Sequence, residues 1–251
     1  MLNYKNFIID NNIIIKDNIV IYTNFFTGGK VEKLVTLKLS DIHKQFRESN
    51  YKRIYEGKYK RKISDEIENY FMLPFSYAYY YFVVSNMRIP KPEELINMYL
   101  DMFCKKKGNK YTFKEDYLVS EHNIEFYRDE LAGRILRGYN SYNREIELFF
   151  KLKEKLSDMK VEYNLKKDLL DGIDTIITYN NKTFGLATYV NTNRSNSFKS
   201  RKNTVRHDYS LFNMIDVKAT MYGENKNVIS YGDVFVYDNT VIDYIRNEIK
   251  K

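Results

Sequence analysis

One helical stretch in the second half of the sequence places an acidic side chain among apolar ones. At about 100° per residue, Glu145 falls within about 40° of four apolar residues. They are Phe149, Leu152, Leu156 and Met159. Glu147 is expected on the opposite, solvent-exposed side. A carboxylate in an apolar stripe is unfavourable unless it is paired or binds a metal. Glu145 is therefore a candidate metal ligand, with a salt bridge to Arg137 or Arg144 as the alternative.

A second acidic residue stands at the start of an expected strand. Asp174 follows Gly172 and Ile173 and precedes a β-branched run. The pleat of a strand can aim such a carboxylate into a cleft, where it would serve as a second metal ligand. The structural alternative is a turn cap, and a turn role is expected of the neighbouring Asp171.

An acid and a lysine alternate on a later apolar strand. In the sequence FNMIDVKATM, Asp216 and Lys218 fall on one face, opposite Ile215 and Val217. Metal-dependent phosphodiester hydrolysis uses such a pair, because the carboxylate helps to hold Mg²⁺ and the lysine orients water or stabilises developing charge. An ion pair on an exposed strand face explains the same pattern equally well.

Two stretches of the chain concentrate positive charge. The candidate nucleic-acid contacts in the acid-free segment 191–207 are Arg194, Ser195, Lys199, Arg201, Lys202 and Arg206. Such a run suits a phosphate backbone, since each neutralised phosphate releases counterions, and a solvated basic loop is the alternative. Residues 51–62 carry six basic residues against one glutamate. They form either a solvated connector or a phosphate-contacting patch.

The composition fits a polyanionic partner and excludes several other classes of protein. The chain has 251 residues, a formal net charge of +8 and a single cysteine, Cys104. One cysteine excludes a disulfide framework, and the three histidines (His43, His122 and His207) lack the spacing of zinc ligands. No apolar run is long enough to span a membrane, and the N-terminus does not resemble a signal peptide. We therefore expect a cytoplasmic protein that binds nucleic acid, with double-stranded DNA as the first expectation.

Turn residues and hydrophobic periodicity predict an α+β fold. In the first part we expect strands between residues 4 and 39 (Phe7 to Asp10 among them), a helix over 40–49, a buried aromatic helix over 71–84 and a helix over 93–106. In the second part we expect helices over 121–138 and 140–159, separated near Gly138, and then strands near 160–164, 173–179, 183–190, 211–221 and 228–237. A tight hairpin is expected at Asn180-Asn181, and a helix from Thr240 ends the chain. These elements predict a helical and short-strand region, 1–120, followed by a mixed sheet flanked by helices, 121–251.

The acids and the order of elements in residues 121–251 resemble the PD-(D/E)XK nuclease superfamily, which has the restriction-endonuclease-like fold. The core of that family is a helix, a three-strand meander, a helix and a further strand. It often carries a glutamate on the first helix, an aspartate at the start of the second strand and an acid-x-lysine on the third. Glu145 and Asp174 match the first two positions. The resemblance implies a Mg²⁺-dependent endonuclease of a restriction, defence or mobile-element system.

The third strand departs from the family pattern. It reads Gly185-Leu186-Ala187-Thr188, with neither an acid nor a lysine. In one alternative, Asp216-Val217-Lys218 supplies the pair and the hairpin at Asn180-Asn181 is an insertion. In a second, the hairpin is the true strand pair and the lysine has moved to Lys199 or Lys202. In a third, the chain is an inactive relative that only binds DNA.

We favour the first alternative, a nuclease in which Glu145, Asp174 and Asp216 hold Mg²⁺ and Lys218 assists the attacking water. Region 1–120 would then supply target recognition or a partner surface, and 191–207 would contact the backbone. Many nucleases of this fold cut both strands as dimers, so the resemblance allows a homodimer, although the sequence shows no coiled-coil heptad. The rival hypotheses are a non-catalytic nucleic-acid-binding protein, such as a component of a larger nucleoprotein assembly, and a protein-interaction module with a tyrosine-rich surface.

Overall fold

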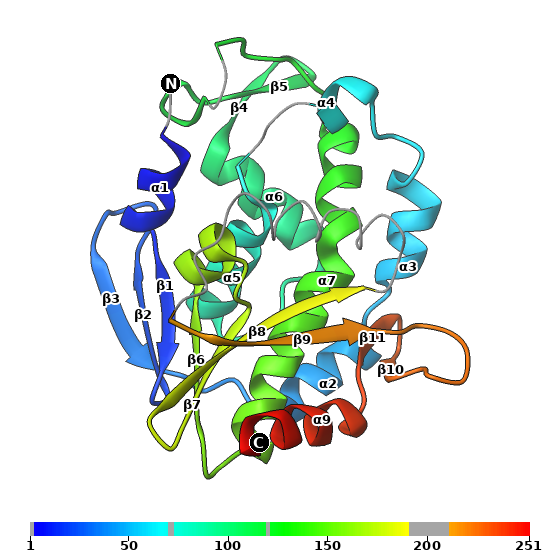
Figure 1. Ribbon diagram of the computed structural model, residues 1–251. Coiled ribbons are helices and arrows are strands. Elements are labelled where there is room, and N and C mark those ends of the chain that lie inside the picture. Colours follow the sequence, from blue (N-terminus) through cyan, green and yellow to red (C-terminus); the bar gives the residue numbers. More distant parts are fainter. Residues whose placement is uncertain (1–2, 70–72, 119–120, 191–210) are drawn as a thin grey trace.

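The computed structural model describes residues 3–69, 73–118, 121–190 and 211–251. They form the expected α+β fold, in which a mixed sheet lies beside one long helix (Figure 1). The helices are α1 (Tyr4–Asp10), α2 (Leu39–Arg47), α3 (Tyr51–Ile54), η1 (Tyr55–Tyr59), α4 (Asp65–Asn69), α5 (Phe75–Asn86), α6 (Pro92–Phe103), η2 (Glu115–Tyr117), α7 (Arg128–Lys155), η3 (Lys167–Asp171) and α9 (Asn239–Lys250). The strands are β1 (Ile13–Lys16), β2 (Ile19–Thr23), β3 (Lys30–Leu34), β4 (Cys104–Lys107), β5 (Lys110–Phe113), β6 (Lys160–Asn164), β7 (Thr175–Tyr179), β8 (Lys182–Val190), β9 (Asn213–Ala219), β10 (Val228–Tyr231) and β11 (Val234–Tyr237).

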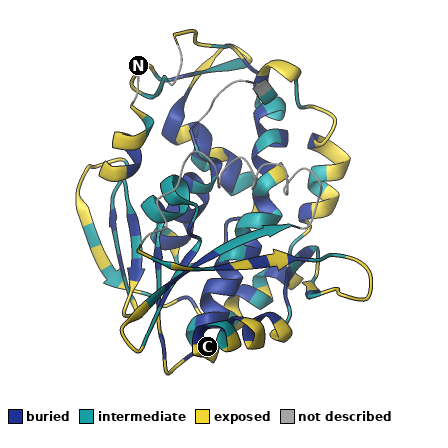
Figure 2. Ribbon diagram, in the orientation of Figure 1, coloured by how far each residue is buried: buried dark blue, intermediate teal, exposed yellow. Residues whose placement is uncertain are grey.

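Helix α7 is the centre of the fold. It runs without a break for 28 residues from Arg128, so the prediction of two helices separated near Gly138 is wrong. A glycine inside a helix costs only about 1 kcal/mol, and the packing of the helix outweighs that loss. Helices α2, α5 and α6 and strands β6 and β11 all contact α7. Figure 2 shows that it is buried along much of its length.

Seven strands form one mixed sheet in the order β3-β2-β1-β6-β7-β8-β9. Neighbouring strands are antiparallel except for β8 and β9, which run parallel. The pairing of β1 with β6 joins strands of region 1–120 to strands of region 121–251. Both residues of the Asn180-Asn181 turn have positive φ, as a type I′ hairpin requires, which confirms the predicted hairpin between β7 and β8.

The first element of the chain is a helix and not the strand predicted at Phe7 to Asp10. Asn3 caps α1 by accepting a hydrogen bond from the Asn6 N–H at 3.2 Å. Phe7 then packs its ring edge-on against Tyr77, with 5.2 Å between the ring centroids. The cap and the contact with the aromatic core outweigh the strand preference of the isoleucine-rich run.

The segment predicted as one strand over 228–237 is a hairpin of β10 and β11. Its turn contains Gly232, which has a φ of +57°. A Cβ atom at Gly232 would lie 2.5 Å from the carbonyl oxygen of Phe46 in α2. Glycine is therefore required both by the left-handed backbone and by the close approach of the turn to α2.

Helix α5 is the predicted aromatic helix, and it is buried on all sides. The hydroxyl groups of buried tyrosines need hydrogen-bond partners. Tyr79 donates to Asn143 Oδ1 of α7 at 2.6 Å, and Tyr80 donates to Glu145 Oε2 at 3.3 Å. Within the described ranges, no helix has both the length and the apolar character needed to cross a membrane.

Glu147 is fully buried, which contradicts its predicted place on a solvent-exposed side of the helix. Its Oε1 atom lies 2.7 Å from Lys151 Nζ and 2.8 Å from His43 Nε2 of α2. Lys151 also donates to the carbonyl oxygen of Tyr237 in β11, and the His43 ring stacks on Tyr231 of β10. The prediction failed because a helical wheel assumes one buried face, whereas α7 is covered on several sides. This ion-pair network links α2, α7 and the β10–β11 hairpin.

Replacement of Glu147 by alanine should destabilise the fold strongly. The variant leaves Lys151 buried without its carboxylate, a change that typically costs about 3–5 kcal/mol. The matched control is Glu154→Ala on the same helix, where the side chain is 54% exposed. It should change stability by less than about 0.5 kcal/mol. Urea unfolding of the two variants measures the difference, and equal stabilities would show that the network contributes little.

Candidate active site

Glu145 lies in the middle of α7 and is half-buried. Burial raises the pKa of its carboxyl group well above the usual glutamate range, and the negative charges of Asp174 and Asp168 raise it further. The Arg144 guanidinium and the hydrogen bond from Tyr80 act in the opposite direction and are smaller influences. The sequence-predicted salt bridge to Arg137 does not form, because Arg137 pairs with Glu68 at 2.5 Å. Glu145 is thus a carboxyl group whose negative charge the surrounding protein opposes.

Asp174 comes directly before β7 and is fixed to the neighbouring strand. Its N–H donates to the carbonyl oxygen of Leu186 at 2.8 Å, and its Oδ2 accepts a hydrogen bond from the N–H of Thr188. Gly172, with a φ of +70°, ends η3 and turns the chain into the strand. The sequence predicted both Glu145 and Asp174 as site residues, and the negative charge of Asp174 adds to burial in raising the pKa of Glu145.

A third acid of this site, Asp168, was not predicted from the sequence. It lies in η3, a short π-helix, and its Oδ2 accepts a hydrogen bond from the Tyr163 hydroxyl at 2.9 Å. Its charge is one of the causes of the raised pKa of Glu145. The sequence KKDLLDG carries no periodicity that distinguishes Asp168 from Asp171, which forms an ion pair with Lys167 at 2.8 Å.

Two stacked tyrosines form a wall of the site. The rings of Tyr80 and Tyr163 are 4.6 Å apart, with an angle of 29° between their planes. Burial raises the pKa of Tyr80 well above its ordinary value, and the charges of Glu145, Asp168 and Asp174 add to this effect. The Tyr80 hydroxyl therefore stays protonated and donates toward the acids. A sequence signal for Tyr80 existed, because a tyrosine inside an all-buried helix must direct its hydroxyl to a partner.

Asp216 and Lys218 lie on the exposed face of β9, and Ile215 and Val217 lie on its buried face, as predicted. In the parallel register, Asp216 is beside Ala187 and Lys218 is beside Tyr189. Both side chains line a cavity of about 480 Å³ between the strand and α9. The hairpin of β7 and β8 stands between β6 and β9 in the sheet, so it is part of the sheet itself and not an insertion beside it.

The predicted backbone contacts of segment 191–207 lie outside the described residues. They are Arg194, Ser195, Lys199, Arg201, Lys202 and Arg206. The described part of the site comes from α5, α7, β6, η3 and the start of β7.

The acidic residues offer a limited set of ligands for the predicted Mg²⁺. In the described part of the chain, no three His, Cys, Asp or Glu side chains are grouped closely enough to hold a metal ion together. Mg²⁺ commonly takes only one or two carboxylates and completes its shell with water and substrate phosphates. Glu145 and Asp174 fit that smaller set, because a bound cation would offset both the burial and the neighbouring negative charge that raise the pKa of Glu145.

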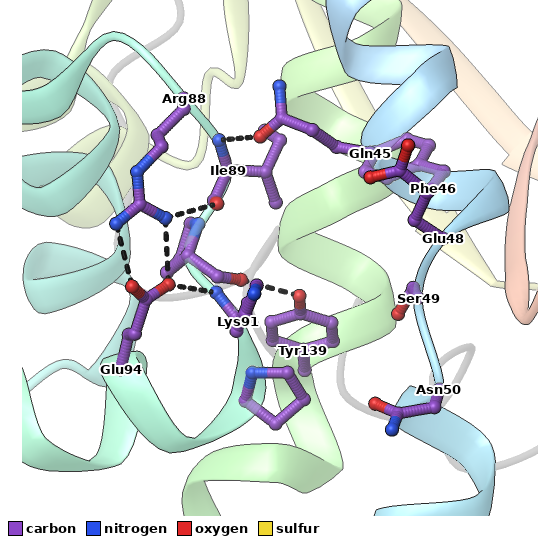
Figure 3. Close-up of a pocket in the computed structure, with 12 residues that line it drawn as sticks. Gln45, Phe46, Glu48, Ser49, Asn50, Arg88, Ile89, Lys91, Glu94 and Tyr139 are labelled. Carbon is purple, nitrogen blue, oxygen red and sulfur yellow. Dashed lines mark hydrogen bonds and ion pairs between the residues drawn. The ribbon is translucent and has the colours of Figure 1, made fainter.

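A separate cavity of about 520 Å³ lies where α2, α7 and the turn between α5 and α6 meet (Figure 3). Arg88 and Glu94 form a two-pronged ion pair across it, with N–O distances of 2.6 and 2.7 Å. Gln45 accepts a hydrogen bond from the Ile89 N–H, and Tyr139 donates one to the carbonyl oxygen of Pro90. Because these polar groups bind one another, we assign no ligand to this cavity.

Comparison with known proteins gives no relative from which a function could be transferred. No family model matches the chain, no curated protein matches it, and no solved structure matches it. The resemblance to the PD-(D/E)XK superfamily therefore stays a prediction, and the functional argument depends on the residues of the site.

The raised pKa of Glu145 predicts that stability falls as pH rises above the usual glutamate range. Between that range, near about 4.3, and the raised pKa, the folded state holds a proton that the unfolded chain has lost. Glu145→Gln mimics the protonated carboxyl group and therefore removes this loss of stability at higher pH. The variant should match the wild type at low pH and melt at a higher temperature at neutral pH, by about 2–4 °C for each kcal/mol gained.

Thermal melts across the acid-to-neutral range measure this effect. Glu154→Gln, an exposed change on the same helix, is the matched control and should follow the wild-type curve. A Glu145→Gln curve that also follows the wild type at every pH would show that the charge of Glu145 is not opposed by its surroundings.

Proposed function

We propose that this chain is a nuclease that hydrolyses phosphodiester bonds in nucleic acid, with Glu145 and Asp174 at the reacting centre. The observation that carries the proposal is that burial and the negative charges of Asp174 and Asp168 raise the pKa of Glu145, which accepts a hydrogen bond from Tyr80 at 3.3 Å. Structural carboxylates are normally compensated, as Glu147 is by Lys151 and His43. A carboxyl group whose pKa is raised by burial and by neighbouring acids is typical of catalytic and metal-binding sites.

The order of elements around these acids supports the proposal. Helix α7 is followed by the antiparallel meander β6-β7-β8, and β9 lies parallel to β8. The helix, the meander and the last strand agree with the order that the resemblance implies, the second helix of that order would fall outside the described residues, and Glu145 and Asp174 have the positions of its first two acids. The proposal places the reaction there and not at Asp216 and Lys218, because those residues face a different cavity against α9.

In the proposed reaction, a water oxygen adds to phosphorus and one bridging P–O bond breaks. A bound Mg²⁺ would neutralise charge on the phosphate and lower the pKa of the attacking water. Glu145 and Asp174 would hold the ion, and Tyr80 would orient Glu145 through its hydrogen bond. The proton of the attacking water passes to a carboxylate or to solvent, and the leaving oxygen takes one from solvent.

The proposed substrate is double-stranded DNA, and the proposed location is the cytoplasm. The net charge of +8 favours a polyanionic substrate. The single cysteine, Cys104, is buried and unpaired, as expected in a reducing compartment. A homodimer that cuts both strands is part of the same proposal.

A second candidate function, nucleic-acid binding without catalysis, is favoured by one feature of β8. In the register of β7 with β8, Ala187 and Thr188 lie beside Asp174, where the resemblance requires an acid and a lysine. The cleavage experiment below separates the two candidates.

A cleavage assay on supercoiled plasmid and on single-stranded DNA tests the proposal. We expect products with Mg²⁺ or Mn²⁺ and none with EDTA. Asp174→Asn keeps an oxygen that can accept the Thr188 hydrogen bond but removes the charge. It should lower the cleavage rate by about 100-fold or more, as loss of a catalytic group does.

Glu145→Gln should lower the rate similarly, and the control Glu154→Gln should cleave like the wild type. Metal-dependent cleavage that persists in both Asp174→Asn and Glu145→Gln would place the reaction elsewhere. Salt-sensitive DNA binding without any product would replace the nuclease proposal with the binding protein.

A further inference from the structure

A second strongly charged feature lies on α3, η1 and the turn that follows them. We name as the basic ridge the six cations of this stretch: Lys52, Arg53, Lys58, Lys60, Arg61 and Lys62. All six side chains are exposed. The sequence left open whether residues 51–62 are a solvated connector or a phosphate-contacting patch. The structure shows helical turns over Tyr51–Ile54 and Tyr55–Tyr59 with their cations exposed, which agrees with both alternatives.

Two buried tyrosines lock the basic ridge onto the body of the protein. The Tyr51 hydroxyl donates to the carbonyl oxygen of Leu136 in α7 at 2.9 Å. The Tyr59 hydroxyl donates to Glu93 at 2.6 Å and accepts a hydrogen bond from Arg128 at 3.2 Å. A Cβ atom at Gly133 of α7 would lie 2.7 Å from the Tyr59 carbonyl oxygen, so a glycine allows this close packing. The helical turns that carry Lys52, Arg53 and Lys58 are therefore packed closely against the rest of the protein.

The charges of the basic ridge are almost uncompensated by the protein itself. Lys58 forms a long ion pair with Glu93, at 3.7 Å. The other five cations form no ion pair with the described residues, and Glu56 is the one acid within the segment 51–62. Like charges held close together repel one another and destabilise the fold, so such an arrangement favours a polyanionic partner.

We propose that the basic ridge binds the phosphate backbone of nucleic acid at a place separate from the acidic site. Leu136, whose carbonyl oxygen holds the ridge, and Glu145 are nine positions apart in α7, and this spacing is about 180° around an α-helix. Figure 1 accordingly shows α3 on one side of α7 and strands β6 and β7 on the other. The ridge therefore contributes to affinity and not to the chemical step. The inference rests on the proposed function only in taking nucleic acid as the ligand.

A phosphate backbone fits the basic ridge better than a membrane surface does. Peripheral membrane helices combine cations with large exposed apolar side chains that enter the lipid. The large exposed apolar residues of the described chain all lie outside segment 51–62, at Ile9, Phe26, Leu34, Tyr127, Leu211, Tyr222, Ile229 and Tyr244. The ridge offers charge without an apolar anchor.

Binding of a labelled DNA duplex in EDTA, followed by fluorescence anisotropy over a range of salt, tests the inference without any need for cleavage. The variant Lys60→Gln/Arg61→Gln/Lys62→Gln should bind about tenfold or more weakly, and its slope of log K against log salt should be shallower by about 2–3. A second variant, Lys52→Gln/Arg53→Gln, should lower the slope by about 1–2. Melting temperatures should not fall, since all these side chains are exposed and their removal relieves repulsion between like charges.

The matched control is Lys105→Gln/Lys106→Gln/Lys107→Gln on β4, which removes the same three positive charges from another exposed surface. It should leave the slope close to that of the wild type. Equal losses in the ridge variant and the control would mean that binding follows net charge alone, and this would overturn the inference. Ridge-dependent binding to phosphatidylserine vesicles with unchanged DNA binding would also overturn it.

Kinetics separate this inference from the proposed function. If the protein cleaves DNA, the ridge variants should raise KM and leave kcat within about twofold, because uniform binding energy is lost. Cleavage with an unchanged KM would refute the proposed role of the basic ridge in binding and would leave the proposed nuclease function intact. DNA binding that depends on the basic ridge, without cleavage, would refute the proposed nuclease function and would support the proposed role of the ridge in binding.

Discussion

The burial of α7 is the constraint on which the rest of the structure depends. Elements on several sides cover this helix, so each charged residue on its covered faces must either find a partner or remain in an unfavourable state. Glu147 has partners, because Lys151 and His43 both lie within hydrogen-bond distance of its Oε1 atom. For Glu145, two residues away, burial and the negative charges of two aspartates raise the pKa of the carboxyl group. The contrast between these glutamates separates a structural carboxylate from a candidate functional one.

The same helix also organises the two charged surfaces of the molecule. On one side, α7 brings Glu145 up to the acids of η3 and β7. On the other, it holds the basic ridge through Leu136 and Gly133. A negative site and a positive surface on opposite sides of one rigid helix can act on the same polyanion without neutralising each other.

Much of this arrangement could be predicted from the sequence, and the failures have physical causes. The inward position of Glu145, the hairpin at Asn180-Asn181 and the alternation on β9 follow from the periods of helices and strands. The buried state of Glu147 could not be predicted, because helical periodicity cannot indicate a helix that is covered on several sides. Asp168 was missed because a π-helix has no recognisable sequence pattern. The continuity of α7 through Gly138 depends on tertiary packing, which local propensity does not contain.

A direct measurement of the ionisation of Glu145 tests the central claim that its charge is held against its surroundings. The carboxyl carbon can be followed by ¹³C NMR over a pH titration, with the signal assigned by its loss in Glu145→Gln. The account predicts that this group titrates well above the other glutamates in metal-free protein and that Mg²⁺ moves its titration to lower pH. Titration of Glu145 within the ordinary glutamate range, with no response to Mg²⁺, would contradict the account.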